Sequence, residues 1–230
     1  YLQLKDVRAE AIQKFYNEKL VSGRADKFKN EKGELVTKPG GLNPKTIKNM
    51  HNMLHEALEQ ALKNNIIVRN PCKAVILPKI QKHEMRVLTP KEQQKLLEAA
   101  RQDRLGMGII LALATGLRLG ELLALQWKDI NTKAGTLTVQ RTVNRLKTFD
   151  EDAKNKTAIV FGEPKTKTSR RTIPLQGVIL KELKDYKKRQ NREKVKNIAI
   201  YQKQGFVFAN EVGNPIEPRT FQDVFYKLIK

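Results

Sequence analysis

One arginine stands where the sequence could build a phosphate-binding site. Arg118 lies in the run 114–122 and directly follows Thr115-Gly116, which ends a nearly all-apolar stretch. The apolar residues after it predict a short helix that packs inward, with the arginine at its rim. A guanidinium is always charged and can donate two parallel hydrogen bonds to a phosphate. Glu121, one helical turn later, is placed to orient it. The alternative is a structural Arg–Glu pair that closes the turn.

A second segment, residues 164–175, is strongly basic and leads into a predicted strand. It reads Pro-Lys-Thr-Lys-Thr-Ser-Arg-Arg-Thr-Ile-Pro-Leu and contains Lys165, Lys167, Arg170 and Arg171. A basic strand or hairpin tip suits the phosphate backbone of DNA. The alternative interpretation is a solvated, lysine-rich turn.

Together, these two segments resemble the tyrosine recombinase (phage integrase) family. In that family, an Ala-Thr-Gly-Leu-Arg-x-Gly-Glu-Leu segment supplies the first catalytic arginine. A Lys-Thr segment on a β-hairpin, shortly before Ile-Pro-Leu, supplies the catalytic lysine. Here the segments match Arg118 and Lys165, and Lys167 is the alternative for the lysine. The resemblance covers nearly the whole chain and points to integrases of phages or conjugative transposons.

The resemblance implies phosphoryl transfer at a DNA phosphodiester, used to integrate or excise a mobile element. A tyrosine hydroxyl attacks the phosphorus, a 3′-phosphotyrosine forms, and the 5′-hydroxyl leaves. This chemistry needs cations around the phosphorane and a proton donor for the leaving oxygen. Arg118 fits the first role and Lys165 the second. No cofactor and no metal are expected, because arginines neutralise the developing charge and the sequence has no carboxylate cluster at ligand spacing.

Two further segments of the family pattern have no counterpart in the chain. All three histidines precede Arg118, so the His-x-x-Arg segment is missing. No tyrosine stands in a setting like the family's tyrosine box, and Tyr226 falls on an apolar helical stripe, which predicts that it is packed. The chain also opens with Tyr1 and not Met. We therefore expect a fragment that binds DNA but does not cleave it alone.

The elements that must position these residues form two predicted domains. We expect a helical core-binding domain over 1–77, truncated at its start, then a linker over 78–88. Residues 89–230 are expected to form the N-terminal part of a catalytic domain of mixed α/β type. The predicted fold class is mainly α with a small antiparallel β-sheet (α+β). A capping box at Thr89-Pro90-Lys91-Glu92, with proline at the first helical position, marks the start of the second domain.

Within the first domain, the pattern predicts two helices separated by a polar loop over residues 22–43. The first helix covers 6–21, with Asp6 as its N-cap. The second begins at Asn43-Pro44, a good N-cap and N1 pair. The apolar stripe expected on the first helix consists of Val7, Ala11, Phe15 and Leu20.

In the second domain, short helices should precede a small sheet. Leu137, Val139 and Val143 alternate as in one half-buried strand, and residues 144–157 are expected to form an exposed hairpin tip or insertion. The remaining predictions are helices over 105–114, 117–125 and 176–195, strands over 158–161 and 170–175, and a last helix from Pro218.

The charge of the chain points to a polyanionic partner. The 45 Lys and Arg residues outnumber the 24 Asp and Glu residues, for a formal charge of +21 spread over the whole length. A compact chain this basic repels itself unless a polyanion neutralises it. Duplex DNA is the expected partner, bound by a homotetramer on two DNA sites as the resemblance implies. The candidate DNA contacts are Lys45, Lys48, Asn49, Lys79, Lys82, Arg86, Lys167, Arg170 and Arg171.

Several classes of protein are disfavoured by composition. The single cysteine, Cys72, excludes a disulfide framework and argues against a cysteine-based zinc site. No stretch approaches the roughly 20 apolar residues that span a bilayer, so no membrane partner is expected. The composition fits a reducing, intracellular setting, and the resemblance implies a bacterial or phage-encoded protein that acts on DNA in the cytoplasm.

Two other functions remain open at this point. A non-enzymatic, sequence-specific DNA-binding protein would share the charge and the helices, but it would not require the pair Arg118 and Lys165. A basic RNA- or ribosome-associated protein is disfavoured, because aromatic residues make up only 6% of the chain and no base-stacking motif is visible.

Overall fold

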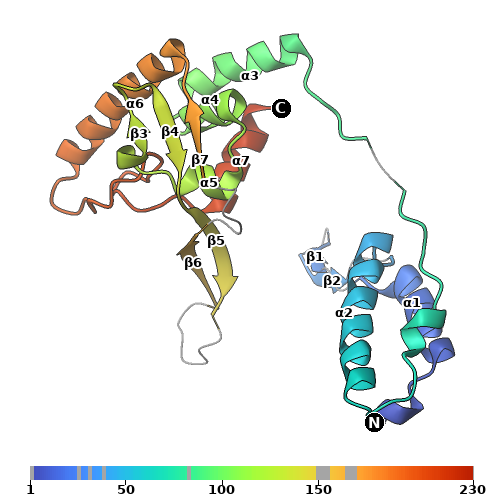
Figure 1. Ribbon diagram of the computed structural model, residues 1–230. Helices are drawn as coiled ribbons and strands as arrows, with labels where there is room; N and C mark the ends of the chain where they lie inside the picture. The colour runs from blue at the N-terminus through green and yellow to red at the C-terminus, as the bar shows by residue number, and fades with distance from the viewer. Residues whose placement is uncertain are drawn as a thin grey trace. The chain divides into compact units, whose positions relative to one another are not determined.

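The computed structural model describes residues 3–24, 27–30, 33–37, 40–81, 84–148, 156–163 and 170–229. The chain divides into two compact units, residues 1–86 and 87–230 (Figure 1). The described residues are mainly helical, with small antiparallel sheets, which confirms the predicted fold class. Residues 75–81 and 84–89, around the boundary between the units, form neither helix nor strand.

In the first unit, two long helices pack against each other and against a short 3₁₀ helix. The second helix begins where Asn43-Pro44 predicts, because the Asn43 side chain accepts the backbone N–H of Lys45 at 2.8 Å. The elements are η1 (Leu4–Asp6), α1 (Ala9–Ser22), β1 (Lys27–Lys29), β2 (Leu35–Thr37), α2 (Pro44–Lys63) and η2 (Pro71–Ala74).

A buried amide fixes the turn that follows α2. Asn70 is buried, and its Nδ2 donates to the backbone oxygen of His55 at 3.1 Å and to Glu59 Oε2 at 2.8 Å. Its Oδ1 accepts the backbone N–H of Cys72 at 3.0 Å. The turn is therefore anchored to α2 beside the core of this unit, which consists of Ile12, Tyr16, Ile47, Leu58 and Cys72.

Two predictions for the first unit were wrong. The first helix begins at Ala9, with Arg8 as its N-cap, and Asp6 lies in η1. Its buried residues are Ile12 and Tyr16, whereas Ala11 and Phe15 of the predicted stripe are exposed; Val7 and Leu20 of that stripe do pack against the core. The stretch 22–43 is also not only loop, because β1 and β2 pair as an antiparallel hairpin. Strands of three residues are too short for alternation to reveal them.

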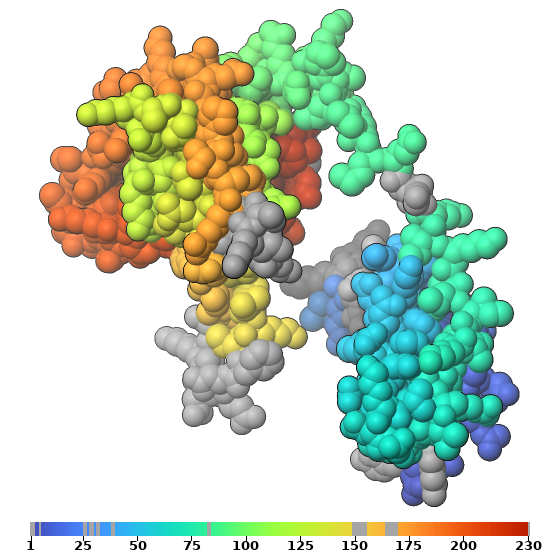
Figure 2. Space-filling model, in the orientation of Figure 1, coloured from blue at the N-terminus to red at the C-terminus, as the bar shows by residue number. Residues whose placement is uncertain are grey.

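In the second unit, helices pack against a three-stranded antiparallel sheet of order β3-β4-β7. Strands β5 and β6 form a separate two-stranded hairpin that extends from the body of the unit (Figure 2). The helices are α3 (Pro90–Gln102), α4 (Gly106–Thr115), α5 (Leu119–Leu123), η3 (Trp127–Asp129), α6 (Gly177–Lys196) and α7 (Pro218–Leu228). The strands are β3 (Ile130–Asn131), β4 (Thr136–Val139), β5 (Thr142–Lys147), β6 (Thr157–Gly162) and β7 (Arg171–Pro174).

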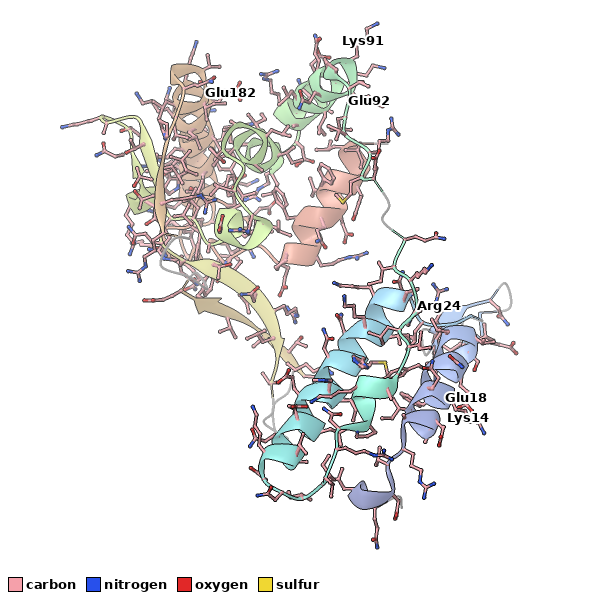
Figure 3. All side chains as sticks on the ribbon, turned by 45° about the vertical axis from the view of Figure 1, so that its right-hand side comes forward. Lys14, Glu18, Arg24, Lys91, Glu92 and Glu182 are labelled. Carbon is pink, nitrogen blue, oxygen red and sulfur yellow. The ribbon has the colours of Figure 1, made fainter. Side chains whose placement is uncertain are left out.

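The predicted capping box begins this unit's first helix. The backbone N–H of Thr89 donates to Glu92 Oε2 at 2.8 Å, and Thr89 Oγ1 accepts the N–H of Glu92 at 3.3 Å. Figure 3 labels Glu92 at this end of α3. Two N–H groups at the helix start thus find partners, as the sequence pattern predicts.

The prediction of one strand over 137–143 was wrong. Leu137 and Val139 lie in β4, whereas Val143 lies in β5, which pairs only with β6 among the described strands. Residues 144–147 and Thr157 lie in β5 and β6, which form an exposed hairpin, and the rest of the predicted tip lies mostly outside the described residues. Leu137, Val139 and Val143 all stand at odd-numbered positions, so a period of two does not reveal that β4 ends at Val139 and β5 begins at Thr142.

A close approach between α5 and β5 depends on Gly120. A Cβ atom at this position would lie 2.5 Å from Thr142 Oγ1 and 2.7 Å from the backbone oxygen of Val143. Only glycine allows the two backbones to come this close. The helix that follows Arg118 is thereby held against the base of the β5–β6 hairpin.

We predict that Gly120→Ala destabilises the second unit. Alanine gains about 1 kcal/mol in helix propensity, but relieving a clash with backbone costs about 1–3 kcal/mol, so a net loss is expected in urea unfolding. Gly177→Ala is the matched control, because a Cβ at the start of α6 meets nothing within 4 Å. Equal stability of the two variants would contradict the proposed role of Gly120.

Candidate active site

Arg118 projects from the junction between α4 and α5. Gly116 ends α4 in the left-handed conformation, with φ of 64°, which glycine adopts without steric cost. Leu117 and Leu122 are buried on either side of the arginine. The Arg118 side chain itself is 75% exposed. A rigid, packed turn therefore presents a guanidinium to solvent.

Glu121 is the buried partner of this arginine, as the spacing of three residues suggested. Its side chain is only 4% exposed. Its Oε2 accepts the backbone N–H of Arg118 at 3.0 Å, and its Oε1 accepts Arg118 Nη1 at 3.0 Å. One carboxylate thus holds both the backbone and the side chain of the arginine.

A second arginine binds the same carboxylate. Arg171, the first residue of β7, donates from Nη2 to Glu121 Oε2 at 2.8 Å and from Nη1 to Oε1 at 3.2 Å. Burial would raise the pKa of Glu121, but hydrogen bonds from Arg171 and Arg118 outweigh it and lower the pKa to about 2. The carboxylate is therefore ionised at any physiological pH.

Arg170 and Arg171 differ in their surroundings, although both were predicted as DNA contacts. Arg170 is 58% exposed and donates to Glu163, itself exposed, at 2.8 Å. The Arg171 side chain is 32% exposed and lies against Glu121. The pairing of Arg171 with Glu121 escaped the sequence reasoning, because no local pattern links residues that lie 50 positions apart.

The other candidate residues have three different outcomes. Lys165 and Lys167 lie outside the described residues, as does Lys82. Lys45, Lys48 and Asn49 are exposed near the start of α2, where Ile47 faces the core. Lys79 and Arg86 are exposed in the segment between η2 and α3. Among the candidate residues that the structure describes, hydrogen bonds bring together Arg118, Glu121 and Arg171.

The tyrosines of the described residues differ in how far they are exposed to solvent. Tyr16 and Tyr186 are buried, and burial raises the pKa of each to about 12. Tyr226 was predicted to be packed, but its side chain is 53% exposed. The packed residues of α7 are Phe221, Val224, Phe225 and Leu228, so Tyr226 lies beside the apolar stripe and not on it.

Among the described residues, no three His, Cys, Asp or Glu side chains lie close enough together to bind a metal ion. Within the same residues, every helix is too short or too polar to cross a membrane.

Residues 86–230, which include the whole Arg118–Glu121–Arg171 cluster, match the Phage integrase family. This match covers more than half of the chain. The chain belongs to the phage integrase family. The cluster therefore lies in the part of this integrase-family chain that carries the family signature.

Curated relatives agree with this assignment. The integrase-family chain is 30% identical to a tyrosine recombinase XerC-like protein of Caldanaerobacter subterraneus subsp. tengcongensis, over 99% of the chain and 56% of the relative. It is 32% identical to the ICEBs1 integrase of Bacillus subtilis, over 65% of the chain and 39% of that protein. The chain thus spans about half the length, or less, of these relatives.

Solved structures share the fold. The Tn1549 transposon integrase, solved in complex with a circular intermediate DNA, superposes with a TM-score of 0.69 at 21% identity, over 98% of this chain and 64% of that one. A lambda integrase tetramer bound to a Holliday junction gives a TM-score of 0.59 at 20% identity, over 98% and 53% of the two chains.

We predict that Glu121 makes the second unit sensitive to acid. Its pKa falls from 4.5 to about 2 on folding, so its stabilisation is complete above about pH 4.5 and is lost as the pH falls towards 2. A shift of this size corresponds to about 3 kcal/mol. Urea unfolding across this pH range should show the loss in the wild type and a flatter dependence in Glu121→Gln.

The control for this prediction is Glu182→Gln, which breaks the more exposed pair of Arg101 and Glu182 between α3 and α6. This variant should keep the acid dependence of the wild type. An unchanged acid dependence in Glu121→Gln would show that other carboxylates are responsible.

Proposed function

We propose that the protein containing this chain is a tyrosine-type site-specific recombinase that cuts and rejoins duplex DNA to integrate or excise a mobile element. The observation that carries the proposal is the exposed guanidinium of Arg118, held by the buried carboxylate of Glu121. Membership of the phage integrase family supports it. Relatives named as recombinase and integrase support the same activity.

Arg118 would bind the non-bridging oxygens of the scissile phosphate. Charge on these oxygens grows as a nucleophile adds to the phosphorus, and a fixed cation stabilises the transition state more than the ground state. Glu121 limits the movement of the guanidinium, so little reorganisation is needed during the reaction. A mobile lysine on the surface would provide the same charge without this direction.

Lys165, with Lys167 as the alternative, would donate the proton to the leaving 5′-oxygen. A tyrosine hydroxyl would attack the phosphorus, lose its proton and form a 3′-phosphotyrosine, while the 5′-hydroxyl leaves. The attack of a 5′-hydroxyl on this intermediate reverses the step. We propose that the nucleophile and the His-x-x-Arg residues lie outside these 230 residues, so that the chain alone binds DNA without cleaving it.

Binding would combine exposed basic residues from both units, among them Lys45, Lys48, Lys79 and Arg170. We propose duplex recombination sites as the partner and a homotetramer on two DNA sites as the active assembly. The net charge of +21 supports a polyanionic partner. A lambda integrase has been solved as a tetramer on a Holliday junction, which supports the assembly.

We predict that the 230-residue chain binds duplex DNA with steep salt dependence. Each neutralised phosphate should contribute about −0.9 to the slope of log affinity against log salt concentration. Fluorescence anisotropy over a salt series would measure it. Lys45→Gln with Lys48→Gln should reduce the slope by about 2 if both lysines contact phosphates. A salt-insensitive complex, or a preference for single-stranded RNA, would contradict the model.

We predict that Arg118→Ala in the full-length protein abolishes the covalent DNA adduct and leaves DNA affinity nearly unchanged. A nicked suicide duplex, built on a sequence selected by the chain from a random pool, would trap the phosphotyrosine. Arg101→Ala is the control, because this arginine of α3 also pairs with a glutamate, Glu182 of α6, and not with Glu121.

Equal losses of binding and adduct in Arg118→Ala would indicate a structural arginine. A wild-type protein that binds the duplex and never forms an adduct would favour a non-enzymatic DNA-binding protein.

A further inference from the structure

We propose that Arg171 is a positioning residue that fixes the Arg118 guanidinium through Glu121, and that it does not serve as a DNA contact. This inference rests on the proposed function, because it concerns the arginine assigned to the scissile phosphate. It differs from the sequence-based expectation, which placed Arg171 among the residues that bind the DNA backbone.

The first argument is the number of hydrogen bonds at one carboxylate. An ionised carboxylate offers about four acceptor sites. Each oxygen of Glu121 accepts one bond from Arg118 and one from Arg171, at distances between 2.8 and 3.2 Å. All four sites are used, so the carboxylate has no freedom to turn towards another partner.

The second argument is how the two arginines use their donors. Arg171 gives both Nη1 and Nη2 to Glu121, in the bidentate geometry that fixes a guanidinium most firmly. Within the described part of the chain, Arg118 binds Glu121 through its side chain by Nη1 alone. Its Nε and Nη2 donors therefore remain available to a phosphate. Arg171 holds the carboxylate, and Arg118 presents the charge.

The third argument is burial. The exposed fraction of the side chain rises from 4% for Glu121 to 32% for Arg171 and 75% for Arg118. A buried carboxylate with a single, mostly exposed partner would be poorly compensated for its desolvation. Arg171 supplies the half-buried cation that keeps Glu121 ionised, and only an ionised Glu121 holds Arg118 strongly.

The position of Arg171 in the fold makes it a rigid anchor. It opens β7, where it pairs with Val139 in the antiparallel register of β4 and β7. It also directly follows residues 164–170, which contain the predicted catalytic lysine. Arg171 is therefore fixed both by the sheet register and by the carboxylate that orients Arg118.

The test compares Arg171→Met with Arg171→Lys in two assays. In the 230-residue chain, carboxyl-carbon NMR measures the pKa of Glu121. We expect this pKa to rise from about 2 to above its ordinary value of 4.5 in Arg171→Met, because burial then outweighs the remaining hydrogen bonds. Arg171→Lys should restore part of the shift, since a point charge replaces the bidentate pair. Arg170→Met should leave the Glu121 pKa unchanged.

In the full-length protein, the second assay measures adduct formation on the suicide duplex against pH. The Arg171→Met defect should deepen as the pH falls from about 8 towards the raised pKa of Glu121, because Glu121 then becomes protonated. At the low end it should reach roughly ten- to a hundredfold, the cost of a misplaced catalytic group. The DNA affinity of Arg171→Met should stay within about threefold of the wild-type affinity, well below a tenfold change.

Arg104→Met is the matched control for this assay. Arg104 is 31% exposed and makes a bidentate pair with Glu193 on α6, so its loss destabilises the fold comparably without touching Glu121. It should show no pH-dependent defect in adduct formation.

The outcomes separate the two proposals. A wild-type protein without any adduct would overturn the proposed function. An unchanged Glu121 pKa in Arg171→Met would overturn only the role of Arg171. A pH-independent defect matched by an equal loss of DNA affinity would make Arg171 a DNA contact after all.

Discussion

The buried carboxylate of Glu121 sets the geometry of the candidate active site. Removing a carboxylate from water costs several kcal/mol unless cations and N–H groups replace the lost hydration. Arg118 and Arg171 provide these partners and lower its pKa to about 2. α5, with five residues, is far too short to be stable by itself. It is held by Leu122 in the core, by this ion cluster and by the glycine contact with β5.

The three-stranded sheet places Arg171 against that carboxylate. Glu121 and Arg171 are 50 residues apart, and the register of β4 with β7 determines where the arginine stands. Because a slip of one residue would send every side chain of β7 to the opposite face, the register is strongly specified. The positions of Arg118, Glu121 and Arg171 are therefore set by a sheet register and a packed turn, not by flexible surface residues.

Local chemistry explains what the sequence could predict. The Asn43 cap, the Thr89 capping box and the spacing of Arg118 and Glu121 all involve residues within four positions, and each has the predicted geometry. Tertiary packing overrides local pattern in three other places. It decides which residues of α1 are buried, whether β1 and β2 pair, and where β4 ends and β5 begins. The pairing of Arg171 with Glu121 could not be predicted for the same reason, since the two residues are distant in the chain.

A chain with a charge of +21 has many cations that can attract DNA, so attraction alone cannot distinguish one phosphate from its neighbours. Direction can. Exposed lysines are mobile point charges, whereas Arg118 is held at one end by a carboxylate and exposed at the other. Two adjacent arginines would repel each other without the acid between them. In this strongly basic protein, the buried negative charge of Glu121 therefore distinguishes one oriented cation from the general basic surface.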